Sequence, residues 1–356
     1  MVFSCWEYNG EKAKGEMTMI RVPDYYDRFR CLAGKCPHSC CEAWDVVLDE
    51  GTVERYRREE GPLGEKLRGN MVEEDGDICF ALRGGPCPFL DEENLCEIHR
   101  QLGEEATSVT CQSHPRFMEE YDGLKEITLS ASCPAANELL LGAQAPLRFV
   151  VTEEGGGGMP EDLAPLYTLR ERALEELGDR SLPLRSRLKW LLALAVQAQA
   201  LLDEGEEEAL LELAQTAAGE VEWEIEENEG LFPQALETLA ELEVLGEDWL
   251  PLLEMGKNTK GLDLEEHAPA LERICAYFLF RYFCKAYSDG DLLSKVQLAL
   301  LGTLVSARLG GICGLGEALR RFSREVEHSD ENLERLEEGF CFDERLSPER
   351  FFIGLK

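Results

Sequence analysis

The stretch "CLAGKCPHSCCEAW" (residues 31–44) decides how the first part of the chain can fold. It places four cysteines, Cys31, Cys36, Cys40 and Cys41, within eleven positions, and two of them are adjacent. Thiols at this density are explained by disulfide bonds, by a metal site or by ordinary packing of small apolar side chains. The rest of the sequence distinguishes between these explanations.

Cysteine usage along the chain favours a metal site. Ten of the fourteen cysteines lie in the first 133 residues, and the N-terminal segment has scattered charges and no apolar stretch of the kind that directs secretion. We therefore expect a cytoplasmic protein, in which reducing conditions disfavour structural disulfides. A dense thiol cluster is then metal-binding or catalytic. Cys275, Cys284 and Cys313 stand alone in apolar helical stretches, and we expect them to pack as small apolar side chains.

Charge and hydropathy argue against two classes of partner. The formal net charge is −35, so the surface repels both nucleic acid and an anionic membrane. The most apolar stretches, residues 188–202 and 274–287, are too short or too interrupted by charge to span a bilayer. We expect them to be core helices.

The chain changes character near residue 150. Before it, short segments are broken by Pro, Gly and Asn. Because a loop-rich region of this kind has little core of its own, it needs a cross-link such as a bound metal. Four consecutive glycines, Gly155 to Gly158, are typical of a flexible joint, and no Walker or Rossmann fingerprint surrounds them. We predict a cysteine-rich domain that binds metal or an iron-sulfur cluster over residues 1–150, and a helical domain over residues 151–356.

The second region has helical periodicity. Leu271, Ile274, Phe278 and Tyr282 recur at three- and four-residue steps, which predicts a core-facing stripe. The predicted fold class is mainly α, with a loop-rich cysteine region followed by a helical bundle. The predicted helices cover residues 160–178, 184–205, 205–219, 232–246, 264–287, 290–309 and 314–327.

The cysteine spacing leaves the kind of metal open. Cys36 and Cys40 are four residues apart and share one face of a helical turn, whereas Cys41 points about 100° away. Soft thiolate ligands suit tetrahedral zinc and iron-sulfur clusters alike. Neither the paired spacing of many zinc ribbons nor that of bacterial ferredoxins is present. His38 and His114 lie near these cysteines, and we expect them to be surface or structural residues rather than ligands.

Three blocks in order make the pattern specific. They are "RVPDYYDRFRCLAGKCPHSCCEAWDVVLD" (residues 21–49), "CPFLDEENLCEIHRQLGEEATSVTCQSHPR" (87–116) and "LSASCPAAN" (129–137). Together they resemble the flagellin lysine N-methylase (FliB) family, within the cysteine-rich, zinc- or iron-chelating proteins of the YkgJ type. The helical stretch 271–309 is similar to the C-terminal part of that family. Asn94 stands where a glycine is common, and Asn also accepts the left-handed conformation.

The resemblance implies N-methylation of lysine side chains on flagellin, with S-adenosyl-L-methionine as methyl donor and flagellin as protein substrate. It also implies a cysteine-bound iron-sulfur cluster of the 4Fe-4S type, with zinc as the alternative metal. The implied metal ligands are the cysteines of the three blocks, namely Cys31, Cys36, Cys40, Cys41, Cys87, Cys96, Cys111 and Cys133.

Methyl transfer to an amine requires that the lysine first lose a proton, because a free lysine has a pKa of about 10.4. The candidates for this catalytic task near the cysteine blocks are Tyr25, Tyr26 and Asp49. Trp44 could face the cationic donor, and the guanidinium of Arg116 could pair with the donor's carboxylate. We take Trp44 and Arg116 as the candidate cofactor-binding residues.

Two other functions fit the same sequence. One is a YkgJ-type zinc- or iron-binding protein without methylase activity, whose cysteines serve to fold the loops. The other is a helical scaffold whose acidic face captures a basic partner.

Overall fold

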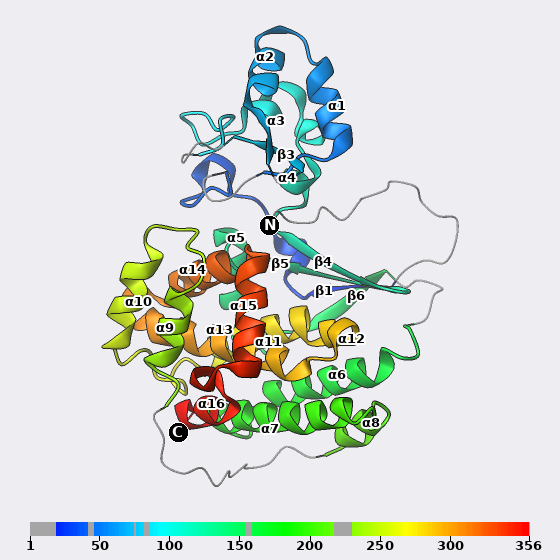
Figure 1. Ribbon diagram of the computed structural model, residues 1–356, viewed down its shortest axis with the longest axis vertical. Coiled ribbons are helices and arrows are strands. Elements are labelled where there is room, and N and C mark those ends of the chain that lie inside the picture. Colours follow the sequence, from blue (N-terminus) through cyan, green and yellow to red (C-terminus); the bar gives the residue numbers. More distant parts are fainter. Residues whose placement is uncertain are drawn as a thin grey trace.

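The structure is a computed structural model, and it describes residues 19–41, 46–74, 76–81, 86–153, 159–216 and 230–355. Trp44 and the tetraglycine segment of the sequence lie outside the described residues. The fold is mainly α, as the sequence predicts. A small cysteine-rich lobe lies at one end of a larger helical body, and a sheet lies between the lobe and the deeper helices (Figure 1).

The small lobe has a core of its own. Asp49 begins its first helix, because its carboxylate accepts the backbone N–H of Thr52 at 2.9 Å. Tyr56, Phe80 and Phe89 stack at the centre, with ring centroids 5.8 Å and 4.6 Å apart in turn. The elements of this lobe are α1 (Glu50–Arg58), α2 (Gly61–Asn70), β2 (Met71–Glu74), β3 (Asp77–Phe80), α3 (Glu97–Leu102), η3 (Glu104–Ala106) and α4 (Val109–Ser113).

The sheet joins the lobe to the body. Its strands are β1 (Met19–Pro23), β4 (Arg116–Tyr121), β5 (Leu124–Leu129) and β6 (Phe149–Glu153), in the order β4-β5-β1-β6. The β1 and β5 strands are parallel, and the other neighbours are antiparallel. The short turns η1 (Tyr26–Arg28) and η2 (Ala33–Lys35) follow β1 and lead toward the lobe.

A buried ionic group fastens the sheet to the helices. The guanidinium of Arg170 donates two hydrogen bonds of 2.6 Å to the carboxylate of Glu126 on β5. Arg21 of β1 reaches Glu171 at 2.8 Å and Glu126 at 3.4 Å. Both arginines lie over the ring of Phe280. The charges are therefore paired and shielded where the two layers meet.

The helical body surrounds one long central helix, α13. Gly302 of α13 allows close packing, because a Cβ there would stand 2.6 Å from the ring of Phe278. The helices and turns of the body are α5 (Pro134–Leu141), α6 (Ala164–Gly178), α7 (Leu184–Asp203), α8 (Ala209–Leu213), α9 (Gln234–Ala240), α10 (Trp249–Lys257), α11 (Ala268–Tyr282), η4 (Phe283–Lys285), α12 (Ala286–Asp289), α13 (Leu292–Cys313), α14 (Leu315–Glu327), α15 (Asp330–Phe342), η5 (Glu344–Leu346) and α16 (Pro348–Gly354).

In the described part of the chain, α13 is the one helix long and apolar enough to cross a membrane. Of its most apolar window, 78% is buried inside the protein, where it packs against α7, α11 and α14. The predicted core positions on α11 are confirmed, because Leu271, Ile274, Phe278 and Tyr282 are all buried. The helix is not buried on one face alone, since Arg273 and Phe280 are buried as well. Cys275 and Cys284 are buried beside them, as the sequence predicts.

The body's hydrophobic core uses residues from both sides of residue 150. Tyr25, Leu124, Leu140 and Leu147 pack into the same cluster as the helices α6 to α16. The separate cluster of the small lobe is formed by residues 46–106. The predicted division near residue 150 stays a prediction, and the glycines on which it depends lie outside the described residues.

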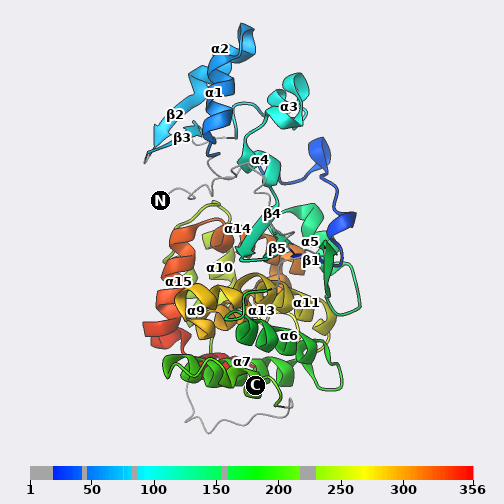
Figure 2. The same ribbon diagram turned by 90° about the vertical axis from the view of Figure 1, so that its right-hand side faces the viewer.

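The two views agree on the position of the lobe. In Figure 1 and in the turned view of Figure 2, the small lobe stands above the end of the body that carries α5 and α14. The helix α7 lies at the opposite end. The end near α5 and α14 is where the cysteine segments meet the body.

Candidate metal centre

A cavity of about 1270 Å³ lies between the small lobe and the helical body. The lobe contributes its loops and the start of α4. The body contributes the start of α5, the loop between α9 and α10, and the junction of α14 with α15. Every cysteine predicted as a metal ligand lines this cavity, namely Cys31, Cys36, Cys40, Cys41, Cys87, Cys96, Cys111 and Cys133.

Four of these thiols lie near one another. The charge of an ionised Cys41 raises the pKa of Cys87, Cys96 and Cys111, and Cys96 does the same to Cys87 and Cys111. Burial is the largest cause in each case, and it brings the pKa of Cys87 to about 12 and that of Cys111 to about 11. Cys111 is solvent-accessible because it faces the open cavity, although protein surrounds it on its other sides. We call these four residues the four-thiol set.

Three more thiols form a second neighbourhood. Burial raises the pKa of Cys133, and the charges of Cys36 and Cys31 raise it further. We call Cys31, Cys36 and Cys133 the three-thiol set. Cys40 lies between the sets: a hydrogen bond with Cys41 raises its pKa most, followed by burial and by the charges of Cys41, Cys111 and Cys31.

The donor chemistry of this cavity fits a thiophilic metal. In the described ranges, no three Cys, His, Asp or Glu side chains are already gathered at metal-binding distance. The thiols thus line one cavity without forming a finished coordination shell. Each thiolate opposes the ionisation of its neighbours, and a cation among them would reverse that effect and release their protons.

Local hydrogen bonds hold the first cysteines of the 31–41 loop. Ala33 has a left-handed backbone with φ of 47°, and its N–H donates to Cys31 Sγ at 3.3 Å. The thiol of Cys36 donates to the carbonyl of His38 at 3.1 Å. Both contacts lie within the residue 31–41 loop, so the loop's own backbone holds these two thiols.

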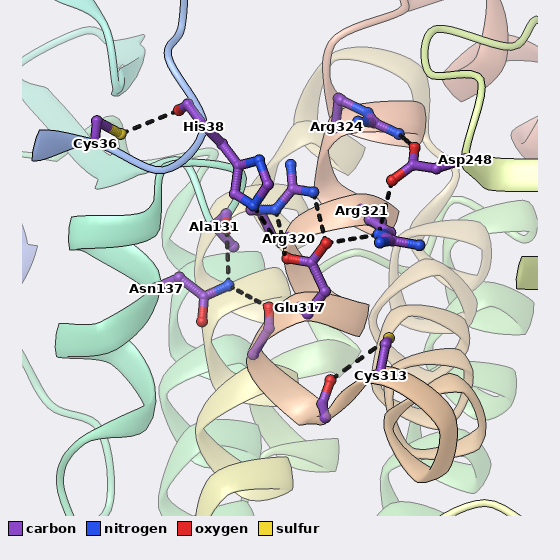
Figure 3. A network of polar contacts seen from close by, with 12 residues as sticks. Cys36, His38, Ala131, Asn137, Asp248, Cys313, Glu317, Arg320, Arg321 and Arg324 are labelled. Carbon is purple, nitrogen blue, oxygen red and sulfur yellow. Dashed lines mark hydrogen bonds and ion pairs between the residues drawn. The ribbon is translucent and has the colours of Figure 1, made fainter. Parts of the chain in front are cut away.

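The loop is also held from the body. His38 Nε2 stands 3.7 Å from a carboxylate oxygen of Glu317 on α14. Figure 3 shows that carboxylate between His38 and the guanidinium groups of Arg320 and Arg321, each of which donates to it at 2.7 Å. Burial alone would raise the pKa of Glu317, but these two arginines lower it to about 2. Glu317 therefore stays charged, and it forms an ion pair with His38 of the cysteine loop when that imidazole is protonated.

The second cysteine block is shaped by a tight turn. The carboxylate of Asp91 accepts the N–H groups of Glu93 and Leu95, both at 2.9 Å, and Asn94 has a φ of 57°. The left-handed residue predicted at Asn94 is thus confirmed. The Cys87 N–H donates to the Cys41 carbonyl at 2.7 Å, which ties the first and second blocks together.

Arg116 lies on the cavity wall, where the sequence predicts a cofactor-binding residue. Its Nε donates to the hydroxyl of Tyr26 at 2.9 Å. The rings of Tyr26 and Phe29 lie 5.7 Å from its guanidinium carbon. These contacts fix the plane of the guanidinium and leave its outer N–H edge for an anion.

The other predicted residues lie elsewhere. Asp49 accepts from Thr52 and from the Val109 N–H at 3.0 Å, and it does not line the cavity. Hydrogen bonds from these residues lower its pKa against the opposing effect of burial. Tyr25 is buried in the body's core, and Tyr26 supports Arg116. Catalytic roles for these three residues stay predictions, and Trp44 lies outside the described residues.

The cavity wall also holds residues that sequence reasoning did not select for the site. His114, Ser132 and His328 line it beside Cys133. Burial and then the charge of Arg116 lower the pKa of His114 to about 4. Burial, followed by the charges of His114 and Arg281, lowers the pKa of His328 as well. The spacing of His328 from the cysteine blocks gives no signal, because its approach depends on how α14 packs.

Curated relatives of this chain carry names that agree with the family suggested by the cysteine blocks. A lysine-N-methylase of Salmonella typhimurium is 27% identical over 162 residues, which are 44% of this chain and 40% of that protein. A lysine-N-methylase of Salmonella choleraesuis is 26% identical over 162 residues, which are again 44% of this chain and 40% of that protein. The matches thus span about two fifths of these two relatives.

A third relative is covered more completely. The flagellar biosynthetic protein FliU of Salmonella muenchen is 30% identical over 129 residues, which are 34% of this chain and 76% of that protein. The chain matches no protein-family profile, and no solved structure matches it. The link to YkgJ-type proteins stays a prediction. By its likeness to these methylases and to FliU, the chain belongs to the lysine N-methylase (FliB) family.

Proposed function

We propose that the protein transfers methyl groups from S-adenosyl-L-methionine to lysine side chains of flagellin in the cytoplasm, with a cysteine-bound iron-sulfur cluster. The observation that carries the proposal is the convergence of eight cysteines from three separate blocks on one cavity, with Arg116 on its wall. The names of the relatives supply the reaction and its connection to the flagellum.

We assign metal binding to both thiol sets. The four-thiol set has the number of ligands that fills a 4Fe-4S cluster or a tetrahedral zinc ion. The three-thiol set has one ligand fewer, so a cluster there would keep one position for a substrate group. When bound, such a cluster supplies a Lewis-acidic iron for the amino and carboxylate groups of the methyl donor. Zinc is the alternative metal for either set.

Arg116 is the residue of this chain best placed to orient the donor. Its Nε donates to the hydroxyl of Tyr26, and it lines the same cavity as Cys31 and Cys133 of the three-thiol set. A planar guanidinium pairs with a carboxylate through two parallel hydrogen bonds, which fixes direction as well as position. We assign Arg116 to the donor's carboxylate.

The part of the cavity lined by the helical body suits a cationic acceptor. Glu243, Glu247, Asp330 and Glu331 line the side of the cavity formed by the helical body. The lining arginines of α14 are already paired, Arg320 with Glu317 and Arg324 with Asp248. The acidic residues therefore keep a negative field that attracts a lysine side chain.

The direct test is methyl transfer by anaerobically purified, metal-loaded protein. Flagellin and a donor with a labelled methyl group are incubated with the wild type, with R116K and with the surface control R100K. We expect label on flagellin lysines, a raised KM for the donor in R116K, and wild-type behaviour in R100K. Metal-loaded wild type that transfers no label to flagellin would refute the methylase and leave the metal-binding alternative.

A further inference from the structure

The small lobe is attached to the helical body through few contacts. The described helices and strands of the lobe do not pack extensively on those of the body. Each part has a hydrophobic core of its own, and the two buried clusters are separate. The chain crosses between the parts after β1 and again where α4 leads into β4. Apolar packing therefore does little to fix the lobe against the body.

The loop that carries Cys31 and Cys36 belongs to the lobe. A Cβ on Gly34 would stand 2.6 Å from the carbonyl oxygen of Glu93, so the loop lies directly against the turn of the second cysteine block. At the other end of the loop, the Cys41 carbonyl accepts a backbone N–H of that same block at 2.7 Å. Both thiols are therefore carried by the lobe.

Cys133 belongs to the body instead. It is the N-cap of α5, and the Asn137 N–H donates to its carbonyl at 2.9 Å. The side chain of Asn137 donates to the carbonyls of Ala131 at 2.9 Å and Gly316 at 3.0 Å, which ties α5 to the start of α14. Leu140 of α5 lies in the body's hydrophobic core. The position of Cys133 is thus set by the body.

The three-thiol set therefore spans the joint between the lobe and the body. All three of its cysteines line the cavity that lies in this joint. Burial raises the pKa of Cys133 most, and the charges of Cys36 and Cys31 raise it further, so the three thiols are neighbours in the cavity. One group of ligands thus comes from two parts with separate cores.

The four-thiol set lies within the lobe. Cys87 is in the lobe's hydrophobic core, and Cys41 and Cys96 pack against that core. Cys111 is on α4, which is also part of the lobe. A metal held by these four thiols cross-links segments of the lobe to one another. It does not bridge the joint.

A metal bound to ligands from two parts of a protein becomes a cross-link between them. Building on the metal centre of the proposed function, we propose that a thiophilic metal or cluster bound by the three-thiol set fastens the small lobe to the helical body and fixes the width of the cavity. Each thiol that binds loses its proton to solvent and forms one sulfur-metal bond. The lobe's Cys31 and Cys36 are thereby held at a constant distance from Arg116 of the body.

The test measures the distance between the lobe and the body in the full chain. Spin labels are attached through genetically encoded keto amino acids at Glu54 of the lobe and Glu254 of the body, both of which are exposed. Pulsed electron paramagnetic resonance then gives the distance distribution for the wild type, C133S and C96S. Each protein is compared after chelation, after loading with zinc, and after reconstitution with iron and sulfide.

We expect one narrow distance in the loaded wild type and a broad distribution after chelation, because the two chain crossings alone leave the lobe free to pivot. C133S should lose metal and also lose the narrow distance. C96S is the matched control, because it loses metal from within the lobe and should keep the narrow distance. Metal content is measured on the same samples.

The outcomes separate this inference from the function on which it rests. C133S that loses metal and keeps the narrow distance overturns the fastening, and so does equal broadening in a folded C96S. If C133S does not fold, C31S decides, because it removes a ligand of the same set from the lobe's side and should broaden the distribution. Loaded wild type with a narrow distance and no methyl transfer refutes the methylase alone. Wild type that binds no metal refutes the metal centre and the fastening together.

Discussion

His114 shows how a residue on the cavity wall affects stability. Its pKa lies near 4, because burial and Arg116 oppose a positive charge on the ring. The pKa of a histidine in an unfolded chain is about 6.5. Between these two values the unfolded chain binds more protons than the native protein. The stabilisation is therefore complete above pH 6.5 and is lost as the pH falls through 4.

This linkage predicts a pH-dependent difference between the wild type and H114Q. The wild type should lose up to about 3 kcal/mol of unfolding free energy more than H114Q between pH 7.5 and pH 4, because the variant has no ring to protonate. Urea unfolding at both pH values, at matched metal content, measures the difference. H267Q, a change at the N-cap of α11 away from the cavity, should follow the wild type, and an identical loss in H114Q would show that folding does not lower the pKa of His114.

At the level of single residues, the sequence selects cysteines that line one cavity, and their role as metal ligands stays a prediction. All eight cysteines can be selected because thiols at this density have few roles in a reducing compartment. Asp49, a candidate catalytic base from the sequence, caps α1 and accepts from the N–H groups of Thr52 and Val109, and its catalytic role stays a prediction. His328 could not be selected at all, because its serine partners are about two hundred residues away in sequence.

Among the elements, the sheet and α6 depend on one buried ion pair. Arg170 is fully buried and Glu126 is 3% exposed, so neither charge is solvated if its partner is removed. E126Q should lower the unfolding free energy by about 3 kcal/mol, because it leaves the buried guanidinium of Arg170 with only the more distant carboxylate of Glu171, at 3.5 Å. E120Q removes the exposed pair with Lys125 and should change it by less than about 1 kcal/mol. Chemical denaturation of both variants tests the comparison, and equal small losses would contradict it.

Helices with a strong apolar period were predictable, whereas short ones were found with the wrong bounds or missed. The predicted helix over 232–246 is the shorter α9, and of 205–219 the described residues form only the short α8. The helices α10, α15 and α16 were not predicted. The predicted helices over 160–178, 184–205, 264–287, 290–309 and 314–327 correspond to α6, α7, α11, α13 and α14. The helices α1 and α2 were missed within a region described as loops, because their sequences are rich in charge and glycine. Their stability comes from the Asp49 cap and from burial of Tyr56 and Leu67, which the local pattern does not reveal.

For the whole molecule, Glu317 links the small lobe's cysteine loop to the helical body. E317Q removes the negative charge that contacts Arg320 and Arg321 and that pairs with His38 when its imidazole is protonated, so the comparison is made at about pH 6. A partly exposed ion pair contributes up to about 1 kcal/mol, so opening of the 31–41 loop should become about five-fold more frequent. Tryptic cleavage after the exposed Lys35 measures this opening. E54Q, which breaks an exposed pair with Arg58, should leave the rate unchanged, and an unchanged rate in E317Q would contradict the link.

Metal content tests the convergence of the thiols most directly. Iron, zinc and acid-labile sulfide are measured in anaerobically prepared wild type, C96S, C133S and the control C275S. We predict metal in the wild type and in C275S, and a loss of the four-thiol set's metal in C96S and of the three-thiol set's metal in C133S. Wild type with neither iron nor zinc, or full metal content in both C96S and C133S, would contradict the account.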